Sequence, residues 1–180
     1  MMPTIDRALA ARIKDAARQD VSGMIGDLGR KPTDEETVEM ISRAVADNGE
    51  VAELDDGQIE AMRLGMIDDM LHYGPLRPLL EDPAVTEICV HSCDKVFAER
   101  DGVLSREHGV AFDDEDHLRR IIDQIAQGVD RRIDDGSPLL DARMEDGSRV
   151  NAVVAPIALG GSSLTIRRFP EHRLQAARNS

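Results

Sequence analysis

Residues 138–169, PLLDARMEDGSRVNAVVAPIALGGSSLTIRRF, decide the fold of this chain. Residues 139–144 and 149–155 are short runs of the composition that suits a pleated, half-buried surface, so we expect two strands. The pair Asp146-Gly147 lies between them and tolerates the positive φ of a tight turn. The two strands should therefore pair antiparallel in a hairpin.

The same stretch continues into a third strand. Gly160 and Gly161 form a natural turn, and residues 164–169 then alternate apolar and polar side chains. Arginines recur near the ends of these strands, at Arg143, Arg149, Arg167 and Arg168.

The segment before this stretch adds two strands and a helix. Residues 85–90 and 95–99 predict strands, and Asp101-Gly102 turns the second onto Val103-Leu104. A helix is predicted by apolar residues at helical spacing: Leu118, Ile121, Ile122, Ile125 and Val129. Consecutive antiparallel strands with a helix on one face predict an α+β domain with a mixed, mainly antiparallel sheet and flanking helices, and not a doubly wound fold.

The first part of the chain is helical in pattern. Ile5, Leu9 and Ile13 recur at every fourth residue. Thr33 and Glu36 form a capping box before a second apolar face, made by Val38, Ile41 and Val45.

A third helical stripe is rich in methionine and should end at Gly74-Pro75. Its members are Ile59, Met62, Met66, Ile67, Met70 and Leu71. Packing in a core is the simpler interpretation, and an adaptable face that binds a partner is the alternative. We therefore expect a helical N-terminal region at residues 1–68, an α+β domain at 69–169 and a C-terminal tail at 170–180.

Composition limits the classes of function. The formal net charge is −13, from 35 acidic and 22 basic residues, and only 2% of the residues are aromatic. Such a chain repels a phosphate backbone and lacks stacking platforms, so we expect no nucleic acid partner. No apolar run reaches the roughly 20 residues of a membrane span. Two cysteines are too few for a disulfide framework, which favours a cytoplasmic setting.

Two clusters of possible metal ligands have simpler explanations. Cys89, His91 and Cys93 are three candidates, one short of a closed zinc site, so we expect no metal there. Four consecutive acidic residues, 113–116, precede the predicted helix. Their position favours an N-cap and a first turn aligned with the helix dipole over a cation site.

Four blocks of the chain carry a family resemblance, and they cover about residues 69–169 in order: YGPLRPLLEDPAVTEICV, KVFAERDGVL, HLRRIIDQIAQGVDRRID and SPLLDARMEDGSRVNAVVAPIALGGSSLTIRRF. Together they resemble the N-terminal domain of CpaF-type secretion ATPases. CpaF-type ATPases are motors of tight-adherence pilus assembly within the type II and type IV secretion superfamily. The combination of DGSRVN with TIRRF is the most specific part of the resemblance, whereas His91-Ser92-Cys93 departs from the usual turn.

The resemblance implies an arrangement of domains and a nucleotide site. In that family the N-terminal domain precedes a RecA-like ATPase domain, nucleotide lies between the two, and the protein assembles as a hexameric ring. Inner-membrane pilus or secretion platform proteins are the implied partners, which would place the chain in the cytoplasm and peripherally at the inner membrane.

The resemblance also implies phosphate contacts by arginines. The matching positions are Arg149, Arg167 and Arg168, with Arg143 a weaker candidate. Arginine suits this task because its planar, charged fork bonds phosphate oxygens bidentately. The alternative is that each arginine solvates a strand end or pairs with a nearby carboxylate, from Asp134, Asp135, Asp141 or Glu145.

The sequence has no run of the form G-x-x-x-x-G-K-[ST], which cradles phosphates and holds magnesium in P-loop ATPases. We expect no ATP hydrolysis by this chain alone, no catalytic residue within it, and binding of ATP and Mg²⁺ only where a RecA-like domain is supplied. It would then be a shortened or fragmentary accessory module. The alternatives are a standalone interaction module of pilus machinery that uses the helical first half, and a truncated gene product.

Overall fold

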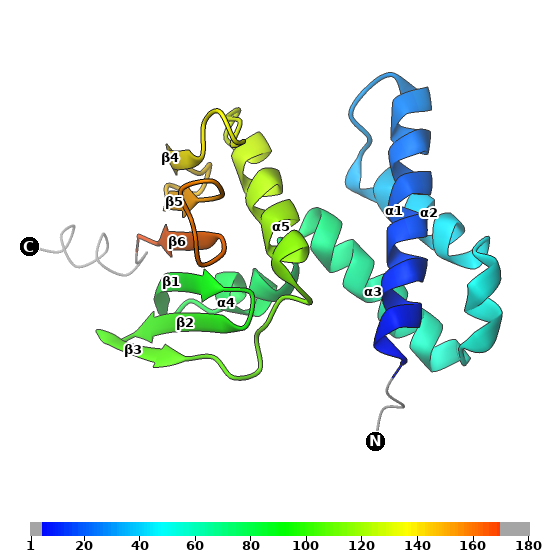
Figure 1. Ribbon diagram of the computed structural model, residues 1–180, viewed down its shortest axis with the longest axis horizontal. Coiled ribbons are helices and arrows are strands. Elements are labelled where there is room, and N and C mark those ends of the chain that lie inside the picture. Colours follow the sequence, from blue (N-terminus) through cyan, green and yellow to red (C-terminus); the bar gives the residue numbers. More distant parts are fainter. Residues whose placement is uncertain (1–4, 170–180) are drawn as a thin grey trace, which may run out of the picture. The chain divides into compact units, whose positions relative to one another are not determined.

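The computed structural model describes residues 5–169 (Figure 1). The chain divides into two compact units, Met1–Gly74 and Pro75–Ser180. The division falls at the Gly74-Pro75 pair that was expected to end the third helical stripe. The domain assignment from the sequence, with its boundary at residues 68 and 69, stays a prediction. In the described part of the chain, no helix has the length and apolarity that crossing a bilayer requires.

The first unit contains three α-helices, α1 (Arg7–Leu28), α2 (Asp34–Ala46) and α3 (Asp56–Leu71), and a short 3-10 helix, η1 (Gly49–Glu53). Side chains start each α-helix. The Asp6 carboxylate accepts a hydrogen bond from the Leu9 N–H at 2.9 Å. Thr33 and Glu36 form the predicted capping box, and Asp55 with Gln58 forms a second one at α3. Each box satisfies helical N–H groups that would otherwise lack a partner.

One apolar cluster holds these helices together. It buries residues at every fourth position of α1 and matching positions of the later helices: Leu9, Ile13, Ala17, Val21, Ile41, Ala44, Val45, Val51, Met62 and Met66. Burying one such large side chain contributes about 1.5–3 kcal/mol. Met62 and Met66 are in the core as predicted, while Ile59, Ile67 and Met70 are only partly buried and pack against it.

The second unit begins with a short 3-10 turn, η2 (Gly74–Leu76), and a short helix, α4 (Arg77–Glu81). Its six described strands form one antiparallel sheet in the order β3-β2-β1-β6-β5-β4. The strands are β1 (Val85–Ser92), β2 (Lys95–Arg100), β3 (Val103–Arg106), β4 (Leu139–Arg143), β5 (Arg149–Val153) and β6 (Ser163–Arg167). This architecture confirms the predicted α+β class.

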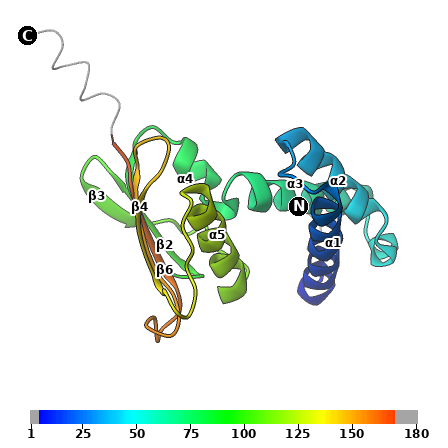
Figure 2. The same cartoon turned by 90° about the horizontal axis from the view of Figure 1, so that it is seen from above.

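Helix α5 (Glu115–Gly128) covers one face of the sheet (Figure 2). Alternate strand residues point to that face and are buried, which is the period of a strand with one covered side. They include Ile88, Val90, Val96, Ala98, Val150, Ala152, Leu164 and Ile166. The predicted apolar face of α5 is buried at Leu118, Ile121, Ile122 and Ile125, whereas Val129 forms the C-cap.

The hairpins form where their turn residues predicted them. Gly147, Asp101 and Gly102 all have positive φ, as tight turns between antiparallel strands require. The strand ends differ slightly from expectation, since β6 ends at Arg167 and β1 continues to Ser92. Beyond the pairings between consecutive strands, β1 pairs with β6 and joins the early and late strands into one sheet. No local pattern announced that pairing.

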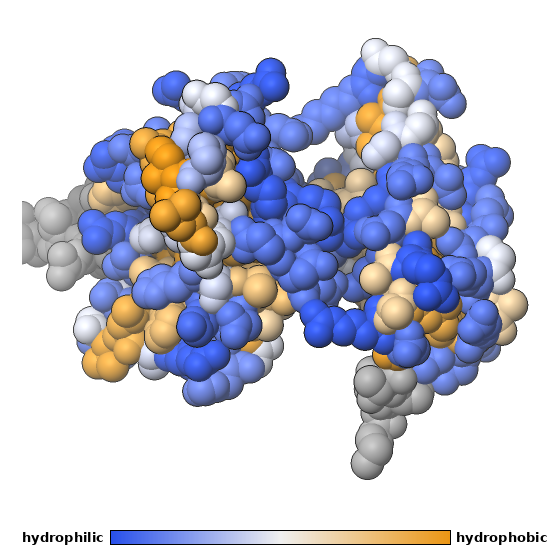
Figure 3. Space-filling view, viewed as in Figure 1, coloured by the Kyte–Doolittle hydropathy of each residue, from blue (hydrophilic) through white to orange (hydrophobic). Residues whose placement is uncertain are grey.

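Exposed apolar side chains gather at two places on this unit (Figure 3). One is the β5–β6 loop, with Ile157 and Leu159, and the other is β3, with Val103 and Leu104. The loop is held at its far end by Glu115 of α5, whose Oε1 accepts a hydrogen bond from the Ser162 N–H at 2.6 Å.

Candidate functional site

The sheet face opposite α5 carries polar side chains. On β4, β5 and β6, the residues between the buried ones are half-buried or exposed, and they share this open face because strand side chains alternate. They include Asp141 and Arg143 on β4, Arg149 and Asn151 on β5, and Thr165 and Arg167 on β6.

Three arginines form one row across this face. Arg143 lies opposite Arg149 in the β4–β5 register, and Arg149 lies opposite Arg167 in the β5–β6 register. Side chains directly opposite on neighbouring strands start about 5 Å apart at Cβ. The antiparallel pairing therefore brings together three of the four arginines chosen from the sequence, and we call them the arginine row.

Carboxylates pair with two members of the row. Arg149 Nε and Nη2 donate to the two carboxylate oxygens of Asp141 at 3.3 and 3.4 Å. Arg167 Nε donates to Glu87 Oε1 at 3.3 Å. The Arg149 and Arg167 side chains remain 62% and 71% exposed, so these are long, solvated ion pairs worth about 0–1 kcal/mol each. Such pairs are weak enough for another anion to replace them.

Arg143 has no such partner. It is the last residue of β4, its side chain is exposed, and within residues 5–169 no group forms a hydrogen bond or ion pair with its guanidinium. Like charges directly opposite on neighbouring strands destabilise a sheet. The row thus contains more positive charge than its described neighbours neutralise, although the sequence ranked Arg143 as the weaker candidate.

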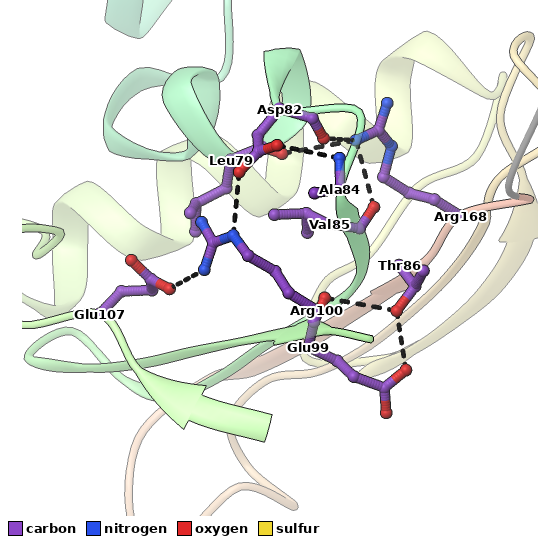
Figure 4. Close-up of polar contacts among 9 residues, drawn as sticks. All are labelled: Leu79, Asp82, Ala84, Val85, Thr86, Glu99, Arg100, Glu107 and Arg168. Carbon is purple, nitrogen blue, oxygen red and sulfur yellow. Dashed lines mark hydrogen bonds and ion pairs between the residues drawn. The ribbon is translucent and has the colours of Figure 1, made fainter. Parts of the chain in front are cut away.

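Arg168 lies apart from the row. It follows Arg167 on the chain, so its side chain leaves the sheet on the opposite side, where its Nη1 donates to the carbonyl oxygens of Asp82 at 2.7 Å and Val85 at 3.3 Å (Figure 4). A longer contact reaches the Leu79 carbonyl of α4 at 3.5 Å. The Arg168 N–H donates to the Thr86 carbonyl at 2.8 Å. These contacts join the end of α4 and the start of β1 to β6.

Arg100 strengthens the same junction (Figure 4). Its Nε donates to Asp82 Oδ2 at 2.9 Å, and its Nη1 pairs with Glu107. The hydrogen bonds that Arg100 donates to the Glu107 carboxylate and then to the Asp82 carboxylate raise the pKa of Arg100. The pKa of Asp82 lies below its usual value, chiefly because its carboxylate accepts the Ala84 N–H and then because of Arg100. Sequence analysis missed this cluster, since its members come from separate elements.

The cysteine and histidine cluster is spread out. Cys89 and His91 both lie on the open face of β1, two residues apart. Cys93 follows the strand, in the turn to β2. Burial, followed by the neighbouring Glu87, raises the pKa of the Cys89 thiol. Nowhere in residues 5–169 do three or more His, Cys, Asp or Glu side chains gather in a way that could hold a metal ion.

The acidic cluster before α5 has the expected capping role. Asp114 is the N-cap, and its Oδ1 accepts the His117 N–H at 2.8 Å. Glu115 and Asp116 occupy the first turn, where negative charge is favourable. His117 is buried, and its Nδ1 accepts the Asp113 N–H at 3.1 Å, a contact that sequence analysis did not foresee.

Comparison with known proteins finds similarity to a type IV secretion protein over about half of the chain. No protein-family model matches the chain. The chain is 38% identical over 98 residues to the type IV secretion system protein VirB11 of Brucella suis, which covers 54% of this chain and 27% of VirB11. It is 49% identical over 106 residues to an uncharacterized protein of Methanocaldococcus jannaschii, covering 56% of this chain and 14% of that protein.

The crystal structure of the Brucella suis VirB11 ATPase in complex with sulphate aligns with 58% of this chain and 34% of its own length, at 33% identity and a TM-score of 0.45. The chain thus spans only a minor part of the relatives it matches. About half of this chain resembles part of a type IV secretion ATPase.

Proposed function

We propose that residues 69–169 form the N-terminal domain of a CpaF-type secretion ATPase and that its arginine row supplies phosphate contacts to a nucleotide site. The row is the observation that carries the proposal, because it holds three guanidinium groups on one face of the sheet, and within residues 5–169 Arg143 has no partner. The sequence similarity to part of VirB11 supports the wider class.

The chemistry follows from charge. Phosphoryl transfer spreads negative charge over the oxygens of the transferred group, and a fixed arginine stabilises that charge. Arg143, Arg149 and Arg167 would meet a triphosphate bound by a RecA-like domain, which would supply the phosphate-binding loop and Mg²⁺. In this proposal the chain assists ATP hydrolysis within a hexameric ring but performs none alone, and the motor would power pilus assembly or protein secretion with inner-membrane platform proteins.

Arg168 has a separate part in this proposal. Its guanidinium is committed to backbone carbonyls, so we assign it to holding β6 and the α4–β1 junction in place. A direct phosphate contact by Arg168 stays a prediction and would require giving up those bonds.

Titration with tripolyphosphate tests the anion site on the chain itself. Backbone amide NMR signals of β4, β5 and β6 should shift at low salt, since exposed charges are little screened there. Arg143→Ala should weaken binding about threefold to tenfold, by the loss of one charge-assisted contact. Arg120→Ala is the matched control, because Arg120 is an exposed arginine on α5 without a described partner, and it should leave binding unchanged.

Equal losses in the two variants, or shifts centred away from the open face, would reject the arginine row as an anion site. The nucleotide role needs a second experiment in which the chain is joined to a RecA-like ATPase domain. There, Arg149→Ala with Arg167→Ala should lower kcat for ATP hydrolysis, and an unchanged kcat would reject the catalytic part of the proposal.

A further inference from the structure

A hollow of about 450 Å³ lies on the first compact unit, between the second half of α1 and the face of α2 beside it. Its lining combines three apolar side chains with four charged ones: Met24, Leu28 and Met40, and Asp27, Glu36, Glu39 and Arg43. It lies in a different unit from the arginine row and is independent of the proposed nucleotide role.

The apolar part of the hollow lies at the end of α1. The fully buried residues of α1 end at Val21, but the helix continues to Leu28. Met24 and Leu28 are only half-buried there, and so is Met40 of α2, although Met24 and Met40 pack against the edge of the core. Met24, Leu28 and Met40 thus give the hollow an apolar floor.

The rim carries negative charge that the unit leaves unpaired. Asp27 and Glu39 are exposed, and neither forms a hydrogen bond or ion pair with any group in residues 5–169. Their neighbour Arg43 forms only a weak, solvated pair with Asp47 at 3.6 Å, outside the hollow. The three carboxylates of the lining outnumber this one arginine, so the rim is acidic on balance.

Glu36, the third carboxylate of the lining, is already engaged. It accepts bonds from Arg30 at 2.6 and 2.9 Å and from the Thr33 N–H at 2.8 Å. These contacts, led by Arg30, lower the pKa of Glu36 to about 2. They also tie the loop after α1 to the start of α2, which keeps the two walls of the hollow together.

We infer that this hollow binds a basic amphipathic helix of a partner protein, with one or two large apolar side chains in the hollow and lysines or arginines beside Asp27 and Glu39. An apolar floor with an acidic rim is complementary to such a helix, and helix-in-groove binding uses anchors at helical spacing. The methionines suit this role because their flexible side chains adapt to different anchors.

A designed peptide tests the inference on the full chain. The probe is a fluorescently labelled amphipathic helix with leucines along one face and lysines elsewhere, and the matched probe has glutamates in place of the lysines. Fluorescence anisotropy should show binding of the lysine peptide only. Glu39→Lys should weaken that binding about fivefold or more, since it replaces an attraction with a repulsion.

The matched control is Glu53→Lys, which makes the same charge change at an exposed position of η1 outside the hollow. It should change the affinity less than twofold. Equal weakening by Glu39→Lys and Glu53→Lys would mean attraction to overall charge and would overturn the inference.

The apolar floor is tested by a second matched pair. Leu28→Gln should weaken peptide binding, whereas Leu64→Gln, at an exposed leucine of α3 outside the hollow, should not. Thermal unfolding checks that both variants fold. NMR shifts of the Met24 and Met40 methyl groups should report the bound peptide. Binding without those shifts, or a dimer of the free chain that Leu28→Gln abolishes, would overturn the assignment to a basic partner helix.

Discussion

Arginines gather in two regions of the sheet unit, and their partners differ. In the arginine row, Arg149 and Arg167 face solvent and reach carboxylates at 3.3 Å or more. At the α4–β1 junction, Arg168 is half-buried and donates to the backbone carbonyl of Asp82 at 2.7 Å. Arg100 donates to the side-chain carboxylate of Asp82 at 2.9 Å. Arg167 and Arg168 are adjacent in sequence, yet alternation of the strand places them in different regions.

Arginine thus has two different uses in the sheet unit. A half-buried guanidinium that bonds carbonyls stabilises the backbone that it joins, and removing it leaves buried acceptors without partners. An exposed guanidinium with weak partners contributes little to stability and stays available for an external anion. Substitutions should therefore act on folding at the junction and on anion binding in the row.

The largest expected effect is on stability at the junction. Arg168→Ala should lower the free energy of unfolding of the sheet unit by about 2 kcal/mol, because the Asp82 and Val85 carbonyls lose a charged donor. Arg143→Ala should change it by less than about 0.5 kcal/mol. Urea unfolding followed through amide signals of β1 and β6 measures both. Equal destabilisation would remove the distinction between the two regions.

A second effect sharpens the role of the row. Asp141→Asn combined with Glu87→Gln removes the carboxylates that pair with Arg149 and Arg167. Tripolyphosphate should then bind about fivefold more tightly, since two weak internal competitors are gone. The control is Asp135→Asn, at an exposed position outside the sheet. A weaker or unchanged affinity, measured by calorimetry at low salt, would show that the carboxylates do not compete with anions.

The smallest effect is the dependence of the junction on pH. The pKa of Asp82 is lower in the folded chain than its ordinary value, so the stabilisation by its carboxylate is present above about pH 4 and is lost as the pH falls through the folded value. Asp82→Asn should flatten this acid-side loss in the sheet unit. Unfolding curves between about pH 5 and pH 2.5 provide the measurement. A loss equally steep in the variant would place the acid sensitivity elsewhere.

Much of the fold could be predicted from short-range patterns. Asp146-Gly147 and Asp101-Gly102 predicted the β4–β5 and β2–β3 hairpins, because positive φ is a property of a few neighbouring residues. Thr33 and Glu36 predicted the start of α2 for the same reason, since the capping box closes within one turn.

The site could be predicted only in part. The resemblance selected four arginines, but it did not separate Arg168 from the others or rank Arg143 with them. The sequence did not reveal the strand register that makes these arginines neighbours. Arg143 lies opposite Arg149 in the β4–β5 hairpin, and Arg149 lies opposite Arg167 on β6, which follows a longer loop. The Arg100 and Asp82 pair gave no local signal at all.

By itself, the sequence determined the α+β class, the hairpin turns, the helix caps and the apolar faces, because each depends on residues within a few positions of one another. Only the tertiary structure decided that β1 joins β6, that three arginines share the open face, and that Arg168 holds the α4–β1 junction. These outcomes depend on pairing between segments that are distant in sequence. A shift of the pairing register by one residue would move every side chain of a strand to the opposite face of the sheet.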